Sequence, residues 1–279
     1  MISFKQFLSE AEVKPHMYKP LSVDELRKVL ENQASDAWRI TTSGGPLFRG
    51  FTNIRQSGLA DPSTGERKSE NVNNQYTSLM ASNPANTDWP KRSKSFICTT
   101  DQWTADAFGE PFYVVPYNGT KYAHVTADDL HLAGGAVRVP GTKIDFRLGY
   151  GYLPGFLELF NLPEDASWSD FVGLIQRLPN MEVDPIREKF FESIIFRGLR
   201  KQDDFLMTAD DEEFMMFVGD LLDCAKDMLT FSKSMNSAGK PNFKLVDSLA
   251  RVEEDVEVWF SGPCVLLTFE DYATLTKSE

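Results

Sequence analysis

The sequence predicts an α+β protein that carries a mainly helical insertion, and three observations lead to this fold class. Apolar residues alternate with polar ones in short runs near both ends of the chain, which is typical of half-buried strands. In the middle of the chain they recur at helical spacing instead. Ser22 and Glu25 have the spacing of a capping box, which marks the start of another helix. We therefore expect a peptide of residues 1–12, a core formed by residues 13–152 and 241–279, and a helical insertion at residues 153–240.

The composition of the chain argues against several classes of protein. The chain has 279 residues, of which 42% are hydrophobic, enough to form one large core or two modest ones. Its formal net charge of -12 argues against binding to nucleic acid, because phosphate contacts need clustered Lys and Arg. No run is long and apolar enough for a membrane span, and the first residues lack the pattern of a secretory signal. We expect a soluble protein that binds small molecules or proteins, and neither nucleic acid nor membranes.

The cysteines and histidines do not indicate a metal site. Cys98, Cys224 and Cys264 are widely spaced and lack metal-ligand spacing, so we expect free thiols in a reducing compartment. His124 and His131 flank a short polar segment, but no Cys or third His completes a ligand set. We expect no metal.

The elements of the first part of the chain follow in order. Residues 20–34 predict an amphipathic helix. Residues 38–51 predict two short extended pieces broken by a Gly-Gly-Pro turn. The polar, turn-rich residues 61–92 predict a long surface loop or lid. Residues 94–109 predict a strand that leads directly into a helix, and residues 110–117 predict a buried strand.

The later elements change from strand to helix and back. Thr126 can cap a short helical turn after the apolar run at residues 122–125. Helical spacing then predicts three helices, within residues 167–178, 186–201 and 211–235. Period-two strands return at residues 252–269, around a Gly-Pro break.

Four features of these elements carry chemistry, in chain order. An arginine, Arg49, closes the short strand LFRG and is followed by Gly50. The strand SFICTT ends in small polar side chains, and the helix TADAFG follows it. The late strand EDVEVWF carries Asp255 and Glu257, which share one face if the strand alternates regularly through both.

This layout resembles the Arg, Ser-Thr-Ser, Glu-x-Glu pattern of mono-ADP-ribosyltransferases of the bacterial-toxin type, over residues 38–150 and 243–270. In this sequence Cys98 stands in place of the first Ser and Asp255 in place of the first acidic residue. The resemblance implies a core of two small packed β-sheets with flanking helices around a cleft for NAD, the co-substrate.

The resemblance also implies roles for individual residues. Glu257 would be catalytic, stabilising the oxocarbenium-like centre of the NAD ribose while it holds a ribose hydroxyl. Asp255 would orient or deprotonate the acceptor. Arg49 would bind a phosphate of NAD, and Gly50 would allow close approach. The small polar residues of the strand end would brace the nicotinamide ribose and the catalytic glutamate; they are Cys98, Thr99 and Thr100.

The N-terminus MISFKQFLSE, followed by Ala11, suggests a second resemblance. On physics alone it predicts a short terminal amphipathic helix. It is also similar to the capsid-targeting peptides of internal head proteins in large tailed phages related to the T-even group, which a prohead protease cleaves after Leu-x-Glu. Leu8-Ser9-Glu10 matches that motif, which implies cleavage between Glu10 and Ala11.

Together these features predict an NAD-dependent mono-ADP-ribosyltransferase that modifies host proteins, with Arg as a candidate acceptor residue. The resemblances imply that it is packaged in a phage head and then acts in the host cytoplasm. Two alternatives stay open. The first is a catalytically inactive structural or binding protein of the virion. The second is an NAD glycohydrolase, which needs Arg49 and Glu257 but no acceptor-directed Asp255.

Overall fold

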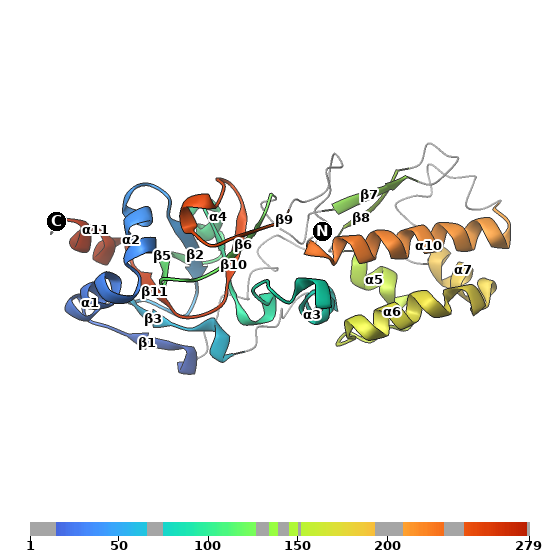
Figure 1. The fold of residues 1–279 in the computed structure, drawn as a ribbon, viewed down its shortest axis with the longest axis horizontal. Helices are drawn as coiled ribbons and strands as arrows, with labels where there is room; N and C mark the ends of the chain where they lie inside the picture. Colours follow the sequence, from blue (N-terminus) through green and yellow to red (C-terminus); the bar gives the residue numbers. More distant parts are fainter. Residues whose placement is uncertain are drawn as a thin grey trace. The chain divides into compact units, whose positions relative to one another are not determined.

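The computed structural model describes residues 15–65, 75–126, 134–138, 145–149, 152–192, 209–231 and 243–277. The described residues combine helices and strands in an α+β arrangement (Figure 1). The chain forms two compact units. Unit 1 consists of Met1–Val72, Asp88–Asp129 and Phe243–Glu279, and unit 2 of Asn73–Thr87 and Leu130–Asn242. The predicted peptide 1–12, with its cleavage site at Glu10 and Ala11, lies outside the described residues.

The strands of unit 1 form one antiparallel sheet in the order β1-β3-β11-β5-β2-β4-β10-β6-β9 (Figure 1). Its strands are β1 (Tyr18–Pro20), β2 (Leu47–Phe51), β3 (Gly58–Ala60), β4 (Phe96–Thr99), β5 (Glu110–Pro116), β6 (Tyr122–Val125), β9 (Phe243–Val246), β10 (Glu257–Phe260) and β11 (Cys264–Leu267). The expectation of two separate small sheets is therefore wrong, because hydrogen bonds join these strands into one sheet. The two halves of this sheet are joined where β2 meets β4, at the single register pair Phe48 and Thr99.

Among its described residues, unit 1 has four α-helices: α1 (Val23–Gln33), α2 (Ser35–Thr42), α4 (Gln102–Asp106) and α11 (Phe269–Thr276). The predicted capping box of α1 is confirmed, because Ser22 and Glu25 cap each other's backbone N–H groups. Residues 38–42, predicted to be extended, instead form the second half of α2. Packing overrides local propensity there, because Trp38 is buried and its ring meets Tyr272 edge-on at 5.6 Å.

The core of unit 1 lies on the sheet where the strands are aligned by register. Leu47, Val114 and Leu266 are register partners across β2, β5 and β11, and each is 0% exposed. Full burial of such a side chain contributes about 1.5–3 kcal/mol. Their alignment fixes the register of β2. Arg49 lies two residues after Leu47 on this strand, so the two side chains share a face of the sheet.

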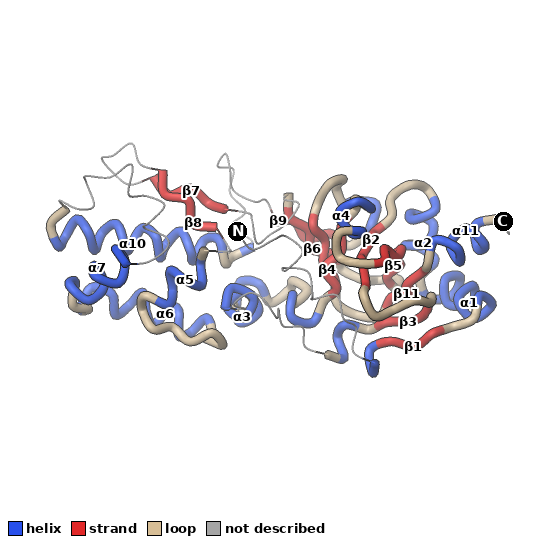
Figure 2. The backbone as a smooth tube through the Cα atoms, turned by 180° about the vertical axis from the view of Figure 1, so that it is seen from behind, coloured by secondary structure: helices blue, strands red, loops and turns tan. Residues whose placement is uncertain are grey.

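Unit 2 contains the predicted helices and a small hairpin. Its described residues include the helices α3 (Gln75–Ser82), α5 (Leu153–Glu158), α6 (Trp168–Arg177), α7 (Val183–Glu192) and α10 (Asp211–Met228), and the strands β7 (Gly134–Arg138) and β8 (Asp145–Gly149). The apolar side of α10 is buried, including Phe214, Phe217 and Leu221. This helix lies between the hairpin and the helices α5 to α7 (Figure 2). The three helices predicted for the insertion are confirmed within the described residues.

The predicted lid at residues 61–92 is, over its described part from residue 75, a packed segment of helix α3 and short 3-10 turns. The Nε2 atom of buried Gln75 donates to the carbonyl oxygens of Leu162 and Pro163, both at 2.9 Å. Asn83 and Asn86 each donate from Nδ2 to the carbonyl oxygen of Leu229 at 2.9 Å, just after α10 ends. Buried amide side chains thus attach this segment to unit 2, which the polar composition alone could not predict.

Candidate active site

The three strands that carry the predicted motif are neighbours in the sheet. Thr99 of β4 is the register partner of Phe48 of β2 and of Glu257 of β10. Register partners share a face of the sheet, and residues one position away point to the opposite face. Phe48, Thr99 and Glu257 therefore share one face, whereas Arg49 and Cys98 lie on the other. The sheet brings the predicted strands together but divides the predicted residues between its two faces.

Arg49 serves the junction between β2 and β4. Its guanidinium donates a hydrogen bond to the carbonyl oxygen of Ile97. The guanidinium carbon lies 5.4 Å from the ring centroid of Phe51 and 5.4 Å from that of Phe96, within cation–π range. Burial lowers the pKa of Arg49, while Cys98, Cys264 and Glu257 act in the opposite direction. The side chain thus contacts β4 where the ladder to β2 ends, and this arrangement does not support its predicted role on an NAD phosphate.

Gly50 is required for packing inside the protein. A Cβ atom at this position would lie 2.2 Å from the carbonyl oxygen of Ala105 and 2.8 Å from the amide nitrogen of Gly109. The space beside Gly50 is therefore occupied by the end of α4 and the turn that follows it. The expectation that Gly50 allows a close approach is right for the protein's own backbone, and no room is left there for a nucleotide.

Cys98 lies in the hydrophobic core of unit 1 and is 3% exposed. Burial raises the pKa of its thiol to about 12, Glu257 raises it further, and Arg49 acts in the opposite direction. Cys98 therefore carries a neutral thiol on the face opposite to Glu257. Its predicted role in bracing the ribose and the glutamate does not fit this placement.

The two threonines that follow Cys98 hold the backbone around the site. Thr99 Oγ1 accepts a hydrogen bond from the amide of Asp101 at 3.0 Å, and Asp101 caps α4. Thr100 Oγ1 accepts from the amide of Val256 at 3.3 Å. Val256 immediately precedes Glu257, so the Thr100 hydroxyl fixes the start of β10. The expectation that small polar groups brace the glutamate applies to Thr100, which acts through the backbone.

Asp255 does not lie in the strand that was predicted to carry it. Strand β10 begins at Glu257, and Asp255 occupies the preceding bend with a positive φ of 53°. The left-handed conformation interrupts the period-two alternation, and Asp tolerates it better than most residues. Asp255 is exposed, whereas Glu257 is 6% exposed. The two carboxylates are therefore not a matched pair on one strand face.

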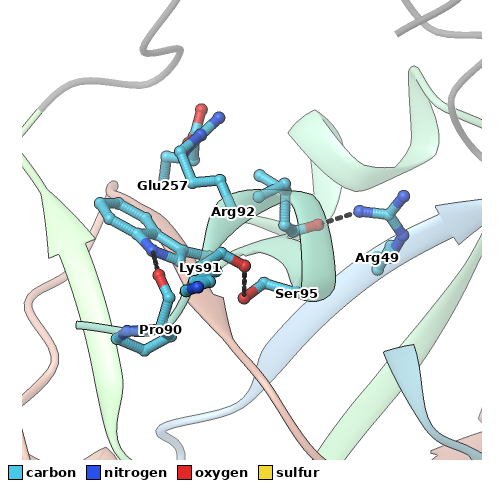
Figure 3. Close-up of polar contacts among 8 residues, drawn as sticks. Arg49, Pro90, Lys91, Arg92, Ser95 and Glu257 are labelled. Atoms are coloured by element: carbon cyan, nitrogen blue, oxygen red, sulfur yellow. Dashed lines mark hydrogen bonds and ion pairs between the residues drawn. The ribbon is translucent and has the colours of Figure 1, made fainter. Parts of the chain in front are cut away.

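Glu257 forms a buried ion pair with Arg92, a residue that the sequence analysis did not identify. The Arg92 guanidinium donates to Glu257 Oε1, and the side chains are 4% and 8% exposed. The guanidinium carbon also lies 5.0 Å from the ring centroid of Trp259. Figure 3 shows Arg92 and Glu257 side by side, with Arg49 apart from both. The basic run at residues 91–94 is a sequence signal for a cation, but it cannot indicate which side chain is buried.

Two properties of the described residues bear on cofactors and location. No group of three or more His, Cys, Asp or Glu side chains among them could hold a metal ion. None of the helices within the described ranges combines the length and apolar character needed to cross a membrane.

No protein-family model, curated protein or solved structure matches this chain. The functional assignment therefore depends on the residues and contacts described above.

Proposed function

We propose that this protein is an NAD-dependent mono-ADP-ribosyltransferase that modifies host proteins, with Glu257 as its catalytic carboxylate. One observation carries the proposal: Glu257 is a buried carboxylate at the first residue of β10, and its register partner is Thr99 at the hydroxyl-bearing end of β4. A carboxylate in a site of low solvent exposure acts strongly on positive charge that develops in a transition state.

The proposed reaction would develop such a positive charge on the ribose of NAD. The bond between nicotinamide and the ribose C1′ breaks, nicotinamide leaves with the electron pair, an acceptor nucleophile bonds to C1′, and its proton passes to a base. Glu257 would stabilise the oxocarbenium-like centre. Asp255, exposed two residues earlier, could take the acceptor's proton. The contacts of Arg49 and Gly50 do not fit the phosphate end of NAD, so the proposal gives them no nucleotide contact.

The proposal includes a place of action. The motif Leu8-Ser9-Glu10 supports packaging in a phage head, cleavage before Ala11 by a prohead protease, and injection into the host cytoplasm. Arg is our candidate acceptor residue on the host protein. These statements derive from the resemblances in the sequence and not from the contacts around Glu257.

The test is transfer of label from biotinylated NAD to proteins of a bacterial lysate by the purified wild type and by Glu257→Gln. We expect discrete labelled bands that are lost in the variant, because the amide keeps the shape of the side chain and removes its charge. An Asp255→Ala variant that still releases nicotinamide but transfers no label would support a transferase. A wild type that releases nicotinamide without labelling any protein would instead be an NAD glycohydrolase.

A second candidate function is a non-enzymatic structural or binding protein of the virion. The observation that favours it is the ion pair itself, since Arg92 already engages the Glu257 carboxylate. Absence of label from the wild type, together with absence of NAD binding by calorimetry, would support this alternative and refute the enzyme.

A further inference from the structure

We propose that Arg92 is the positioning residue of this site, holding the Glu257 carboxylate in a fixed orientation; this inference rests on the proposed function. The sequence pattern indicated Arg49 as the functional arginine, whereas the structure shows the Arg92 guanidinium in contact with Glu257. Both side chains are nearly inaccessible to solvent. Burying one charge without an opposite charge beside it is costly, and the Arg92 guanidinium lies in direct contact with the Glu257 carboxylate.

The segment that carries Arg92 is attached to β10 at two positions and to Ser261, the residue that follows this strand. Glu257, Trp259 and Ser261 are two residues apart, so regular alternation places their side chains on the same side of the chain. Each has a polar contact with a different residue of the segment 90–95. Glu257 pairs with Arg92, Trp259 donates from Nε1 to the carbonyl oxygen of Pro90 at 2.9 Å, and the Ser261 and Ser95 hydroxyls lie 2.8 Å apart.

The segment is also fixed internally. Residues Arg92–Lys94 form a 3-10 turn. The Ser95 hydroxyl donates to the carbonyl oxygen of Lys91 at 2.7 Å, and the amide of Lys94 donates to the same carbonyl at 2.9 Å (Figure 3 shows the first of these bonds). Arg92 therefore extends from a turn whose backbone is hydrogen-bonded within itself and to β10, as expected for a residue that orients another side chain.

The aromatic ring beside Arg92 completes the arrangement. Trp259 is 0% exposed, and its indole N–H is held by Pro90. Its ring lies 5.0 Å from the Arg92 guanidinium carbon, so the cation packs against an apolar surface where it has few alternative orientations. The Trp259 ring and the Glu257 carboxylate therefore contact the same guanidinium. Groups that orient a metal ligand by such a contact change activity by about 10- to 100-fold when removed, and we expect an effect of that size here.

The experiment compares Arg92→Met and Arg92→Lys with the wild type in nicotinamide release from NAD. Met keeps the length and the contact with Trp259 but removes the charge, so we expect kcat to fall by about 10- to 100-fold with little change in KM. Lys restores a charge without the planar fork and should recover part of kcat. The indole N–H resonance of Trp259 should keep its position in both variants, because the contacts of Pro90 and Ser95 remain.

Arg187→Met is the matched control. Arg187 also pairs with a carboxylate, that of Asp211 at 3.1 Å, and lies 4.8 Å from the Phe214 ring centroid, but it belongs to unit 2. We expect wild-type kcat in this variant. The proposal is overturned if Arg92→Met keeps wild-type kcat, or if it loses activity only together with the Trp259 resonance, which would show a purely structural role.

If the wild type cleaves no NAD, the proposed function fails, and the coupling of Arg92 to Glu257 is tested by unfolding alone. Urea midpoints are then compared for Arg92→Met, Glu257→Gln and the double variant. If the urea midpoint of the double variant is no lower than that of Glu257→Gln, the result supports the claim that Arg92 acts through Glu257. Additive decreases of the midpoint refute it.

Discussion

Each unit of the protein contains an arginine that pairs with a carboxylate and lies against an aromatic ring, but the two arrangements differ in burial. In unit 1 the side chains of Arg92 and Glu257 are 4% and 8% exposed, and the ring is that of Trp259. In unit 2 the side chains of Arg187 and Asp211 are 25% and 68% exposed, and the ring is that of Phe214.

The degree of burial determines how much such an ion pair contributes to the stability of the protein. An exposed pair is screened by water and contributes between about 0 and 1 kcal/mol. A buried pair must offset the cost of removing two charges from water, and replacing it with apolar residues is often neutral or stabilising. The Arg187 pair is therefore adequately explained as an ordinary surface contact. The Arg92 pair is expensive to maintain and lies where the sequence indicates chemistry, which favours a functional reason for keeping it.

The largest expected effect comes from breaking each pair at one partner. Glu257→Gln removes the negative charge that faces the buried Arg92 guanidinium, so we expect the free energy of unfolding to fall by about 3–5 kcal/mol. Asp211→Asn should lower it by no more than about 1 kcal/mol. Urea denaturation of both variants measures the difference. Equal losses would show that burial does not separate the two pairs.

A smaller effect is expected from glycine substitutions in the two units. Gly50→Ala introduces a methyl group 2.2 Å from the Ala105 carbonyl oxygen, so we expect a loss of about 3 kcal/mol as α4 is pushed from β2. Gly173 lies within α6 of unit 2 and a Cβ atom there meets nothing within 4 Å. Gly173→Ala should therefore raise stability by about 0.5–1 kcal/mol through higher helix propensity. Thermal unfolding of the two variants checks the opposite signs.

Asn86 is one of the buried amide side chains of unit 2, and its substitution tests whether such a side chain stabilises the fold. Its Nδ2 atom donates to the carbonyl oxygens of Met80 at 3.1 Å and Leu229 at 2.9 Å, and its Oδ1 accepts from the amide of Phe231 at 3.0 Å. Asn86→Ala leaves these buried backbone groups without that side chain, and we expect a loss of about 2 kcal/mol in urea denaturation. The neighbouring exposed Thr87→Ala is the control, with an expected change within about 0.5 kcal/mol.

His124 should give the protein a modest pH dependence. It is 0% exposed on β6, and neither ring nitrogen has a hydrogen-bond partner among the described residues. Burial lowers its pKa, while Glu253 acts to raise it and Lys244 to lower it. The unfolded chain therefore takes up a proton first as the pH falls below about 6.5, and stability is lost from there downward, by at most about 1.4 kcal/mol per pH unit.

Urea midpoints between pH 7.5 and pH 5 measure this effect. His124→Leu should flatten the acidic part of the stability profile, because Leu has no proton to gain in either state. An unchanged profile in the variant would mean that other groups, and not His124, determine the loss at low pH.

The elements defined by local signals could be predicted from the sequence. The capping box at Ser22 fixes the start of α1, and helical periodicity locates α6 and α10. The adjacency of β2, β4 and β10 agrees with the order of the predicted motif, and Thr100 contacts the residue before Glu257. Each of these depends on spacing within one short segment or on a pattern that spans a few such segments.

The unpredicted parts depend on contacts between distant residues. Arg92 and Glu257 are 165 positions apart, and nothing in either segment identifies its partner. The division of Arg49 and Glu257 between two sheet faces follows from a register that only the folded sheet defines. Asp255 was assigned to the strand because its pattern alternates, yet the left-handed backbone at that residue ends the alternation. The side-chain pattern located the strands of the candidate site but could not determine the geometry of its residues.

The most direct measurement is made on a double variant in which Arg92→Met and Glu257→Leu replace the buried pair with apolar side chains. Urea unfolding and nicotinamide release from NAD are measured on the same preparation. If the pair is kept for catalysis, the double variant unfolds within about 1 kcal/mol of the wild type, or is more stable, and releases no nicotinamide above background. A loss of about 3 kcal/mol or more, or nicotinamide release at the wild-type rate, would contradict that role.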